Sequence, residues 1–201
     1  MANQSRFDEL LKRLRDTEKE LEGEMERLLG EQRQRFHYTM EHGKVRFEKS
    51  VHAIQRQYKV GVWRYLREAK LRYVLSAPLI YVMIIPLLFL DISLTVYQQI
   101  CFRIYGIPLV KRTEFFTIDR HLLDYLNAIE KLNCVYCSYG NGVIAYGREI
   151  TSKTEQFWCP IKHAKRASYK HARLDKFFEY GDANAWRQDL KTLRKDWEDK
   201  N

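Results

Sequence analysis

The amino-acid sequence predicts a mainly α-helical protein with one membrane-embedded apolar segment. Three observations support this fold class. A long apolar run lies near the middle of the 201-residue chain. The residues on either side of it are highly charged, and their apolar side chains recur at helical spacing. Three of the four cysteines and one histidine fall in a 30-residue window in the second half of the chain, where we expect a small helical C-terminal domain.

Composition and charge divide the chain into four predicted parts. These are a coiled-coil-like helix at 1–35, a basic juxtamembrane helical region at 36–72, a membrane segment at 73–107 and a soluble helical domain at 108–201. The formal net charge of +9 suits an anionic membrane surface or a nucleic acid. We favour the membrane, because basic residues lie close to the apolar run and no nucleic-acid-binding motif is present.

Residues 1–35 predict a helix with a short coiled-coil seam. The seam residues alternate at spacings of four and three, with Glu18 filling one position: Phe7, Leu11, Leu14, Leu21, Met25 and Leu28. About three heptads are short for a helix that is stable by itself. Two interpretations stay open: the seam packs against the next helix of the same chain, or residues 7–28 mediate self-association or contact with another protein. These residues have no continuous apolar core, so we expect no secretory signal peptide.

The region before the apolar run is basic. A change of pattern over residues 30–43 predicts a turn, and helical periodicity resumes at Val51. The Arg and Lys residues interleaved in this region form a basic face next to the membrane segment. Each well-placed basic residue near an anionic bilayer contributes about 1 kcal/mol. The expected partner is therefore a lipid bilayer that contains anionic lipids.

The apolar run, residues 73–102, has Asp91 as its sole charge. About 20 helical residues cross the hydrocarbon core of a bilayer. Basic residues flank both ends of the run, so the positive-inside rule favours the cytoplasm for both flanks. A helical hairpin satisfies this rule, with residues 74–90 crossing, Asp91 at the far interface and residues 92–105 returning.

Two other arrangements compete with the hairpin. A single span would place Asp91 near the bilayer midplane, at a cost of about 2.5–3.5 kcal/mol. A pair of buried helices in a soluble protein is the third arrangement. Pro78 and Pro86 fit a kink or a break in any of them.

Three segments after the apolar run have helical patterns: 119–133, 143–157 and the tail, 183–197. The glycines of residues 134–142 predict a loop between the first two. Two pairs of metal-ligand residues surround this region, Cys134-x2-Cys137 and Cys159-x3-His163.

Paired ligands at these spacings are typical of tetrahedral zinc, and an iron–sulfur cluster is the alternative cofactor. A straight helix over residues 143–157 would hold its ends about 21 Å apart, so the four ligands converge only if the loop doubles back. A reactive or disulfide-forming Cys134/Cys137 pair is a second interpretation, and reduced cysteines that serve in packing are a third. Cytoplasmic flanks favour the metal, because thiols stay reduced there.

The run IDRHLLDYLNAIEKLNCVYCSYGNGVIAYGREI, followed by TEQFWCPIKHA, resembles an uncharacterised family of small bacterial inner-membrane proteins with a CxxC…CPIKH region. The resemblance covers roughly residues 70–185. It implies a bacterial inner-membrane setting, and it implies no catalytic or binding residues.

The sequence contains no HExxH, GxSxG or Walker-type motif, and it assembles no complete catalytic constellation. We therefore predict a membrane-anchored scaffold or adaptor, with a structural metal site on the cytoplasmic side. One alternative is a membrane-bound redox protein that uses Cys134 and Cys137 or an iron–sulfur cluster. Another is a membrane-associated enzyme acting on a lipid-linked substrate through Asp91 or Asp119.

Overall fold

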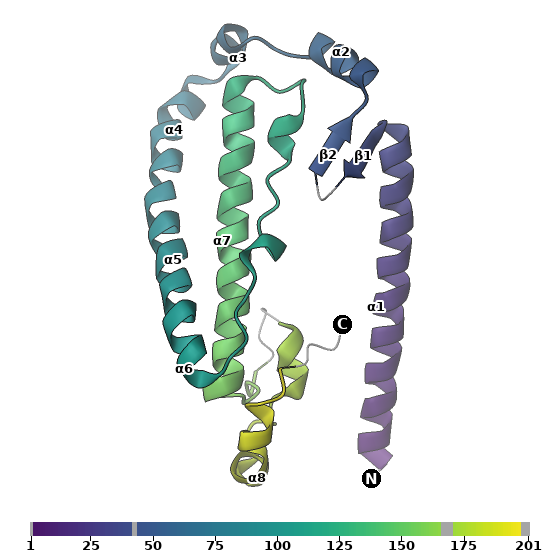
Figure 1. The fold of residues 1–201 in the computed structure, drawn as a ribbon, viewed down its shortest axis with the longest axis vertical. Helices are drawn as coiled ribbons and strands as arrows, with labels where there is room; N and C mark the ends of the chain where they lie inside the picture. The colour runs from purple at the N-terminus through teal and green to yellow at the C-terminus, as the bar shows by residue number, and fades with distance from the viewer. Residues whose placement is uncertain (1, 42–43, 166–170, 198–201) are drawn as a thin grey trace. The chain divides into compact units, whose positions relative to one another are not determined.

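The computed structural model describes residues 2–41, 44–165 and 171–197. Its secondary structure is mainly α-helical, as predicted (Figure 1). The chain falls into two compact units. One contains Met1–Gly61 and Leu122–Asn127, and the other contains Val62–His121 and Ala128–Asn201.

The first unit begins with α1, a helix over Ala2–Arg35. Two short antiparallel strands follow, β1 (Tyr38–Glu41) and β2 (Lys44–Phe47), and then α2 (Lys49–Gln57). The rings of Tyr38 and Phe47, which are opposite each other in the strand register, have centroids 5.7 Å apart. The sequence predicted only a turn here, because four-residue strands are too short to give a clear alternating pattern.

The segment Leu122–Asn127 is attached to α2 through Asp124. The Asp124 carboxylate lies 2.8 Å from Nδ1 of His52, and its backbone N–H donates to the side chain of Gln55 at 3.0 Å. The hydrogen bond with His52 and the positive charge of Arg56 hold the pKa of Asp124 below its usual value. These contacts join two parts of the chain that are far apart in sequence.

The second unit is built around one continuous helix of 35 residues, Leu71–Tyr105, here termed the long helix. It follows α3 (Val62–Glu68) and consists of α4 (Leu71–Val82), α5 (Ile84–Tyr97), a π-helical turn (Gln98–Phe102) and α6 (Arg103–Tyr105). The regular α-helical pattern is interrupted at Met83, because Pro86 has no N–H to donate to the carbonyl of Val82. The helix ends at Gly106, whose φ of 69° suits a left-handed cap.

The predicted hairpin turn at Asp91 is wrong. Asp91 lies inside α5, and the helix continues past it for more than three turns. Leucines, which favour a helix, lie close to Asp91 on both sides, and no glycine or asparagine near it favours a turn. A lone carboxylate does not break such a helix when its oxygens have hydrogen-bond donors, and Asp91 has them.

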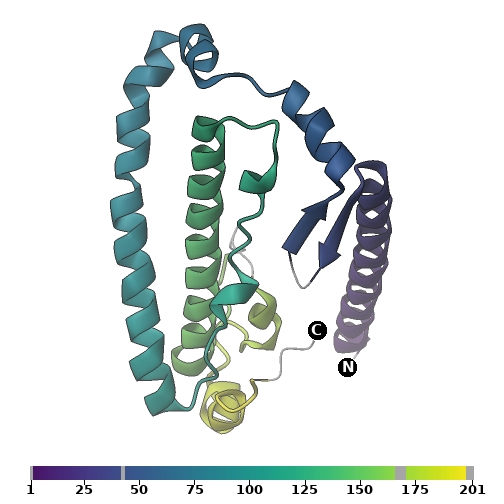
Figure 2. The same cartoon turned by 45° about the horizontal axis from the view of Figure 1, so that its top comes forward.

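After Gly106 the chain runs back along the second unit as residues 106–121, here termed the crossover segment. It contains a short 3-10 turn at Arg112–Glu114, and another at Arg120–Leu122 follows at its end. The chain then enters α7 (Ala128–Trp158), which lies beside the long helix in both views (Figures 1 and 2). The crossover segment makes the two helices parallel, because it returns the chain before α7 begins.

The loop predicted at residues 134–142 is wrong as well, because α7 passes straight through it. The predicted first helix also begins later than expected, at Ala128 instead of residue 119. A glycine in a helix costs about 1 kcal/mol relative to alanine. Tertiary contact offsets this cost at Gly142, where a Cβ atom would lie only 2.7 Å from the ring of Phe116.

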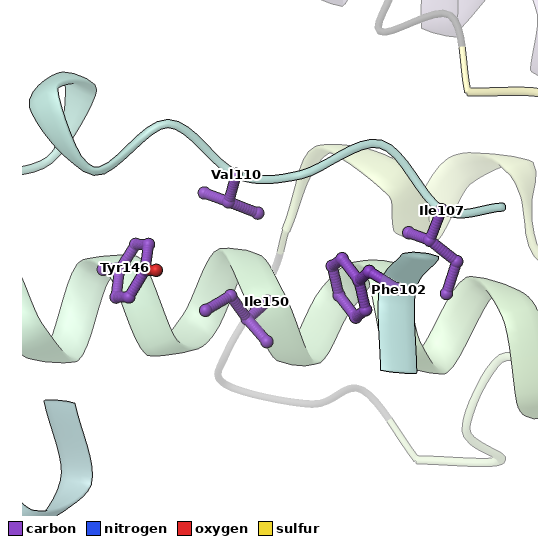
Figure 3. Close-up of a cluster of buried hydrophobic side chains, with 5 residues drawn as sticks. All are labelled: Phe102, Ile107, Val110, Tyr146 and Ile150. Carbon is purple, nitrogen blue, oxygen red and sulfur yellow. The ribbon is translucent and has the colours of Figure 1, made fainter. Parts of the chain in front are cut away.

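The core of the second unit joins these three parts (Figure 3). Phe102 comes from the long helix, Ile107 and Val110 from the crossover segment, and Tyr146 and Ile150 from α7, and all five side chains are buried. The predicted C-terminal helix is present as α8 (Ala183–Leu193), preceded by a 3-10 turn at Ala172–Lys176. The Asp182 carboxylate caps α8 by accepting from the backbone N–H of Ala185 at 2.9 Å.

Candidate membrane-binding surface

The long helix has a protected face that repeats every 3.5 residues. Its less exposed positions include a set spaced by seven: Ala77, Ile84, Asp91, Gln98 and Tyr105. Between them lie further less exposed residues: Tyr81, Leu87, Leu94 and Phe102. A 3.5-residue repeat is the spacing that keeps one helix against another over a long distance. We call this face the seam of the long helix.

Residues spaced by seven on α7 meet this seam: Asn133, Gly140, Gly147 and Thr154. A Cβ atom on Gly140 would lie 3.4 Å from Leu87, and one on Gly147 would lie 2.8 Å from Leu94. The missing side chains therefore let the two backbones approach closely. The pairing proceeds in the same direction along both helices, as expected for parallel packing.

Asp91 is the charged centre of the seam. It is only 6% exposed and forms a two-bond ion pair with Arg112, in which the Nη2–Oδ2 distance is 2.6 Å. The hydroxyl of Tyr139 donates to the same carboxylate oxygen at 2.7 Å. The guanidinium of Arg112 also lies 4.1 Å from the ring centroid of Phe116.

These contacts fix the protonation of the donors around Asp91. The hydrogen bond with Asp91 raises the pKa of Arg112 above its ordinary value, so the guanidinium stays charged. Burial, followed by the interaction with Asp91, raises the pKa of the Tyr139 phenol. Asp91 therefore accepts hydrogen bonds from two groups that keep their protons. This arrangement suits a docking contact between the crossover segment and the long helix better than proton transfer.

Gln98 makes a second docking contact, seven residues further along the seam. Its side-chain oxygen accepts from the backbone N–H of Val110 at 3.0 Å, and its amide nitrogen donates to the Val110 carbonyl at 3.4 Å and to the Tyr146 hydroxyl. The backbone N–H and carbonyl of Val110 thereby have hydrogen-bond partners on a largely apolar helix.

The opposite side of the long helix is apolar and uncovered. Its side chains that are each more than half exposed include Leu71, Leu75, Leu79, Val82, Ile85, Phe89, Ile92, Val96, Ile100 and Ile104. They follow the whole helix, which is about 52 Å long. In the described part of the chain, this is the one helix that is long and apolar enough to cross a membrane by length and composition. An exposed apolar surface of this size marks an interaction site. We call it the outer face.

Basic and aromatic side chains lie at both ends of the outer face. Arg64, Arg67 and Lys70 precede it, beside the highly exposed Trp63. Beyond its far end is a cavity of about 470 Å³. The cavity is lined by aromatic and basic residues together with Gly106: Tyr105, Phe157, Trp197, Lys191, Arg194 and Lys195. Aromatic rings and basic groups are enriched where a protein meets the polar boundary of a bilayer.

The structure does not bring the predicted metal ligands together. Cys134 and Cys137 lie in the first half of α7, Cys159 follows the end of that helix, and His163 lies in the next segment. Because α7 is continuous, Cys137 and Cys159 are about 33 Å apart along its axis. The predicted four-ligand site is therefore not assembled. Among the described residues, no three Cys, His, Asp or Glu side chains are grouped as metal ligands.

The cysteines of the predicted redox pair lie three residues apart on α7. All four thiols are free, and the half-buried Cys134 and the exposed Cys137 occupy one turn of α7. Burial, together with the nearby Glu155, raises the pKa of the Cys159 thiol, which lowers its thiolate fraction at neutral pH.

No protein-family model, curated protein or solved structure matches this chain. The resemblance to a bacterial membrane family stays a prediction. Sequence reasoning missed Gln98 as part of the seam, and it missed Arg112 and Tyr139 as residues that bind the seam at Asp91. A signal was present in the seven-residue spacing of Asp91 and Gln98, the two polar residues that become buried in the apolar run.

Proposed function

We propose that this protein is a membrane-anchored scaffold or adaptor. The outer face of the long helix attaches the protein to a lipid bilayer, and α1 offers its seam to a partner helix. The observation that carries the proposal is the outer face itself, an apolar surface about 52 Å long that no described residue of its own unit covers.

Charge supports a bilayer that contains anionic lipids. Arg64, Arg67 and Lys70 precede the outer face and Arg103 lies near its far end, in a chain with a formal net charge of +9. The positive-inside rule favours the cytoplasmic leaflet for both ends. The family resemblance of residues 118–164 favours a bacterial inner membrane.

The exposed seam of α1 supports the adaptor role. Leu14, Leu21 and Met25 are each at least 60% exposed, so this part of the seam is open to a partner helix. A second α1 helix has the matching apolar spacing.

Vesicle flotation tests the membrane part of the proposal. We expect the full chain to float with vesicles of phosphatidylethanolamine and phosphatidylglycerol. The triple variant Arg64→Glu/Arg67→Glu/Lys70→Glu should bind at least about 100-fold more weakly at low salt, at about 1 kcal/mol per basic residue.

The control variant makes the same charge change on α1, at Lys12, Arg15 and Lys19, and should bind nearly as well as the unmodified chain. Equal weakening of both variants would show a general charge effect. Failure of the unmodified chain to float would overturn the proposal.

A further inference from the structure

We infer that the long helix lies in the plane of the membrane surface instead of crossing the bilayer. Its outer face enters the acyl region of one leaflet, and α7 and the crossover segment stay on the aqueous side. The inference rests on the proposed membrane anchoring and adds the orientation of the anchor.

The first argument is the position of charge beside the long helix. The crossover segment contacts the seam at Gln98 through Val110 and at Asp91 through Arg112, near the middle of the apolar stretch. Next to Arg112, the side chains of Lys111 and Glu114 are 79% and 59% exposed. Further along, Arg120 donates to Ser138 of α7 at 2.9 Å. Charged, non-helical chain therefore lies against the long helix at Gln98 and Asp91 and continues along the neighbouring α7 beyond them.

A spanning orientation would bring this chain into the hydrocarbon core. Irregular backbone exposed to lipid does not occur at that depth, because its polar groups have no water to bond. A basic side chain at the bilayer centre costs about 2.5–3.5 kcal/mol on insertion scales. A span centred near Asp91 would bury Lys111 and Glu114, and a span centred nearer α4 would bury Asp119 and Arg120. No choice of about 20 residues avoids both groups.

The in-plane orientation removes these costs. Leu75, Val82, Phe89 and Val96 repeat every seven residues, two positions before the seam residues Ala77, Ile84, Asp91 and Gln98. They therefore point away from the seam, and all four are more than half exposed. Helices with one apolar side lie at the boundary of headgroups and acyl chains, with that side buried by about 5–10 Å.

Length and flanking charge agree with this orientation. The long helix measures about 52 Å, whereas the hydrocarbon core is about 30 Å thick. A helix that crosses the bilayer has to match this thickness, whereas a helix in the plane of the membrane does not. Arg64, Arg67 and Lys70 at one end and Arg103 at the other then meet lipid phosphates on the same side. The orientation thus satisfies the positive-inside rule at both flanks without a hairpin.

Spin-label depth measurements in vesicles test the inference. The full chain, with its native cysteines replaced by serine, carries a single labelled cysteine at position 75, 82, 89 or 96. The control label is attached to a cysteine that replaces Lys111. Lys111 is next to Arg112, which binds Asp91 on the seam, and so it lies away from the outer face. Flotation with phosphatidylethanolamine–phosphatidylglycerol vesicles precedes each measurement, and accessibility to oxygen and to a water-soluble nickel complex gives the depth.

We expect the four outer-face labels to share one shallow depth and the label at position 111 to remain in water. The four positions extend over about 32 Å along the helix. A spanning helix would therefore give depths that rise to the midplane and fall again, with position 111 in lipid, and this result would overturn the inference. Mutual broadening of the labels without lipid contact would also overturn it, because a second copy would then cover the outer face.

A second measurement keeps the native cysteines. A photoreactive benzoylphenylalanine replaces either Phe89 or Lys111, and irradiation in the same vesicles should crosslink lipid at position 89 only. Lipid crosslinking at both positions would contradict the in-plane orientation. Loss of flotation in the unmodified chain refutes the membrane anchoring itself, whereas flotation with a spanning depth profile refutes the orientation alone.

Discussion

Asp91 shows how one charged side chain affects the packing of an apolar helix. As the sole charge of the run, it suggested a turn at a membrane interface, yet its carboxylate is buried against Arg112 and Tyr139. We expect Asp91→Asn to lower the free energy of unfolding by about 2 kcal/mol, because charge-assisted hydrogen bonds are lost and Arg112 keeps its charge. Thermal unfolding in detergent measures the change.

Lys111→Ala is the matched control for Asp91→Asn. Lys111 is next to Arg112 in sequence, and its side chain is 79% exposed beside Glu114. Its removal should change the free energy of unfolding by less than about 0.5 kcal/mol. Equal effects of the two substitutions would contradict a specific role for the Asp91–Arg112 contact.

Two glycines of α7 give opposite expectations for the same substitution. An alanine Cβ at position 142 would lie 2.7 Å from the ring of Phe116, whereas one at position 140 would lie 3.4 Å from Leu87, an ordinary contact. Gly142→Ala should destabilise the protein by about 1–3 kcal/mol through overpacking. Gly140→Ala should be neutral or stabilise it by up to about 1 kcal/mol through helix propensity.

Thermal unfolding of the two glycine variants, measured side by side, checks this prediction. A Gly142→Ala protein as stable as the unmodified chain would show that the Phe116 ring does not pack as closely against α7 as the 2.7 Å distance indicates.

Asp124 should make the first unit sensitive to acid. Its pKa is lowered in the folded protein, chiefly by the hydrogen bond with His52. The stabilisation is therefore present above the ordinary pKa of aspartate, about 3.9, and is lost as the pH falls through the lower folded-state value. We expect Asp124→Asn to cost about 1 kcal/mol at pH 7 and progressively less below pH ~4. Urea unfolding of both proteins between pH 7 and pH 3 measures this difference, and a difference that does not change with pH would exclude the carboxylate as its cause.

At the scale of the element, α1 is a helix whose described seam side chains, among them Leu14, Leu21 and Met25, are exposed. If the seam mediates self-association, Leu14→Lys/Leu21→Lys should convert a dimer into a monomer, because each lysine would be buried in the helix interface. Sedimentation of the full chain in detergent gives the mass of the assembly. The control is Leu10→Lys, since Leu10 is also exposed but lies off the seam. A wild-type monomer at all concentrations would reject self-association through α1.

The long helix and α7 show which elements the sequence predicts well. Continuous apolar composition identifies residues 73–102 as one apolar segment, but the hairpin turn predicted at Asp91 is absent from the continuous helix Leu71–Tyr105. The break predicted at Gly140 and Gly142 does not occur, because close contact with Leu87 and Phe116 offsets the low helix propensity of glycine. That continuity is also what separates Cys137 from Cys159.

At the scale of the whole molecule, the two sides of the long helix should respond differently to substitution. Leu79→Gln/Phe89→Gln changes the outer face, where both residues are 74% exposed, and should leave the unfolding temperature nearly unchanged. The same change should weaken vesicle binding by several kcal/mol, since burial of a Leu or Phe side chain is worth about 1.5–3 kcal/mol.

Phe102→Ala is the reciprocal variant, because Phe102 is fully buried in the seam. Its loss should lower the free energy of unfolding by about 3–5 kcal/mol. Thermal unfolding and flotation of both proteins test the distinction. A large loss of stability in the Leu79→Gln/Phe89→Gln protein would mean that the outer face is covered by protein.

The sequence by itself determined the mainly helical class, the apolar segment and the basic residues at its ends. These properties depend on local composition and on spacing within one segment, which the order of residues contains directly. Only the tertiary structure decided that Asp91 is buried, that α7 is continuous and that the cysteine pairs stay apart. Each of these depends on contacts between residues far apart in the chain, such as Asp91 with Tyr139 and Phe116 with Gly142, whose energies outweigh local turn and helix preferences.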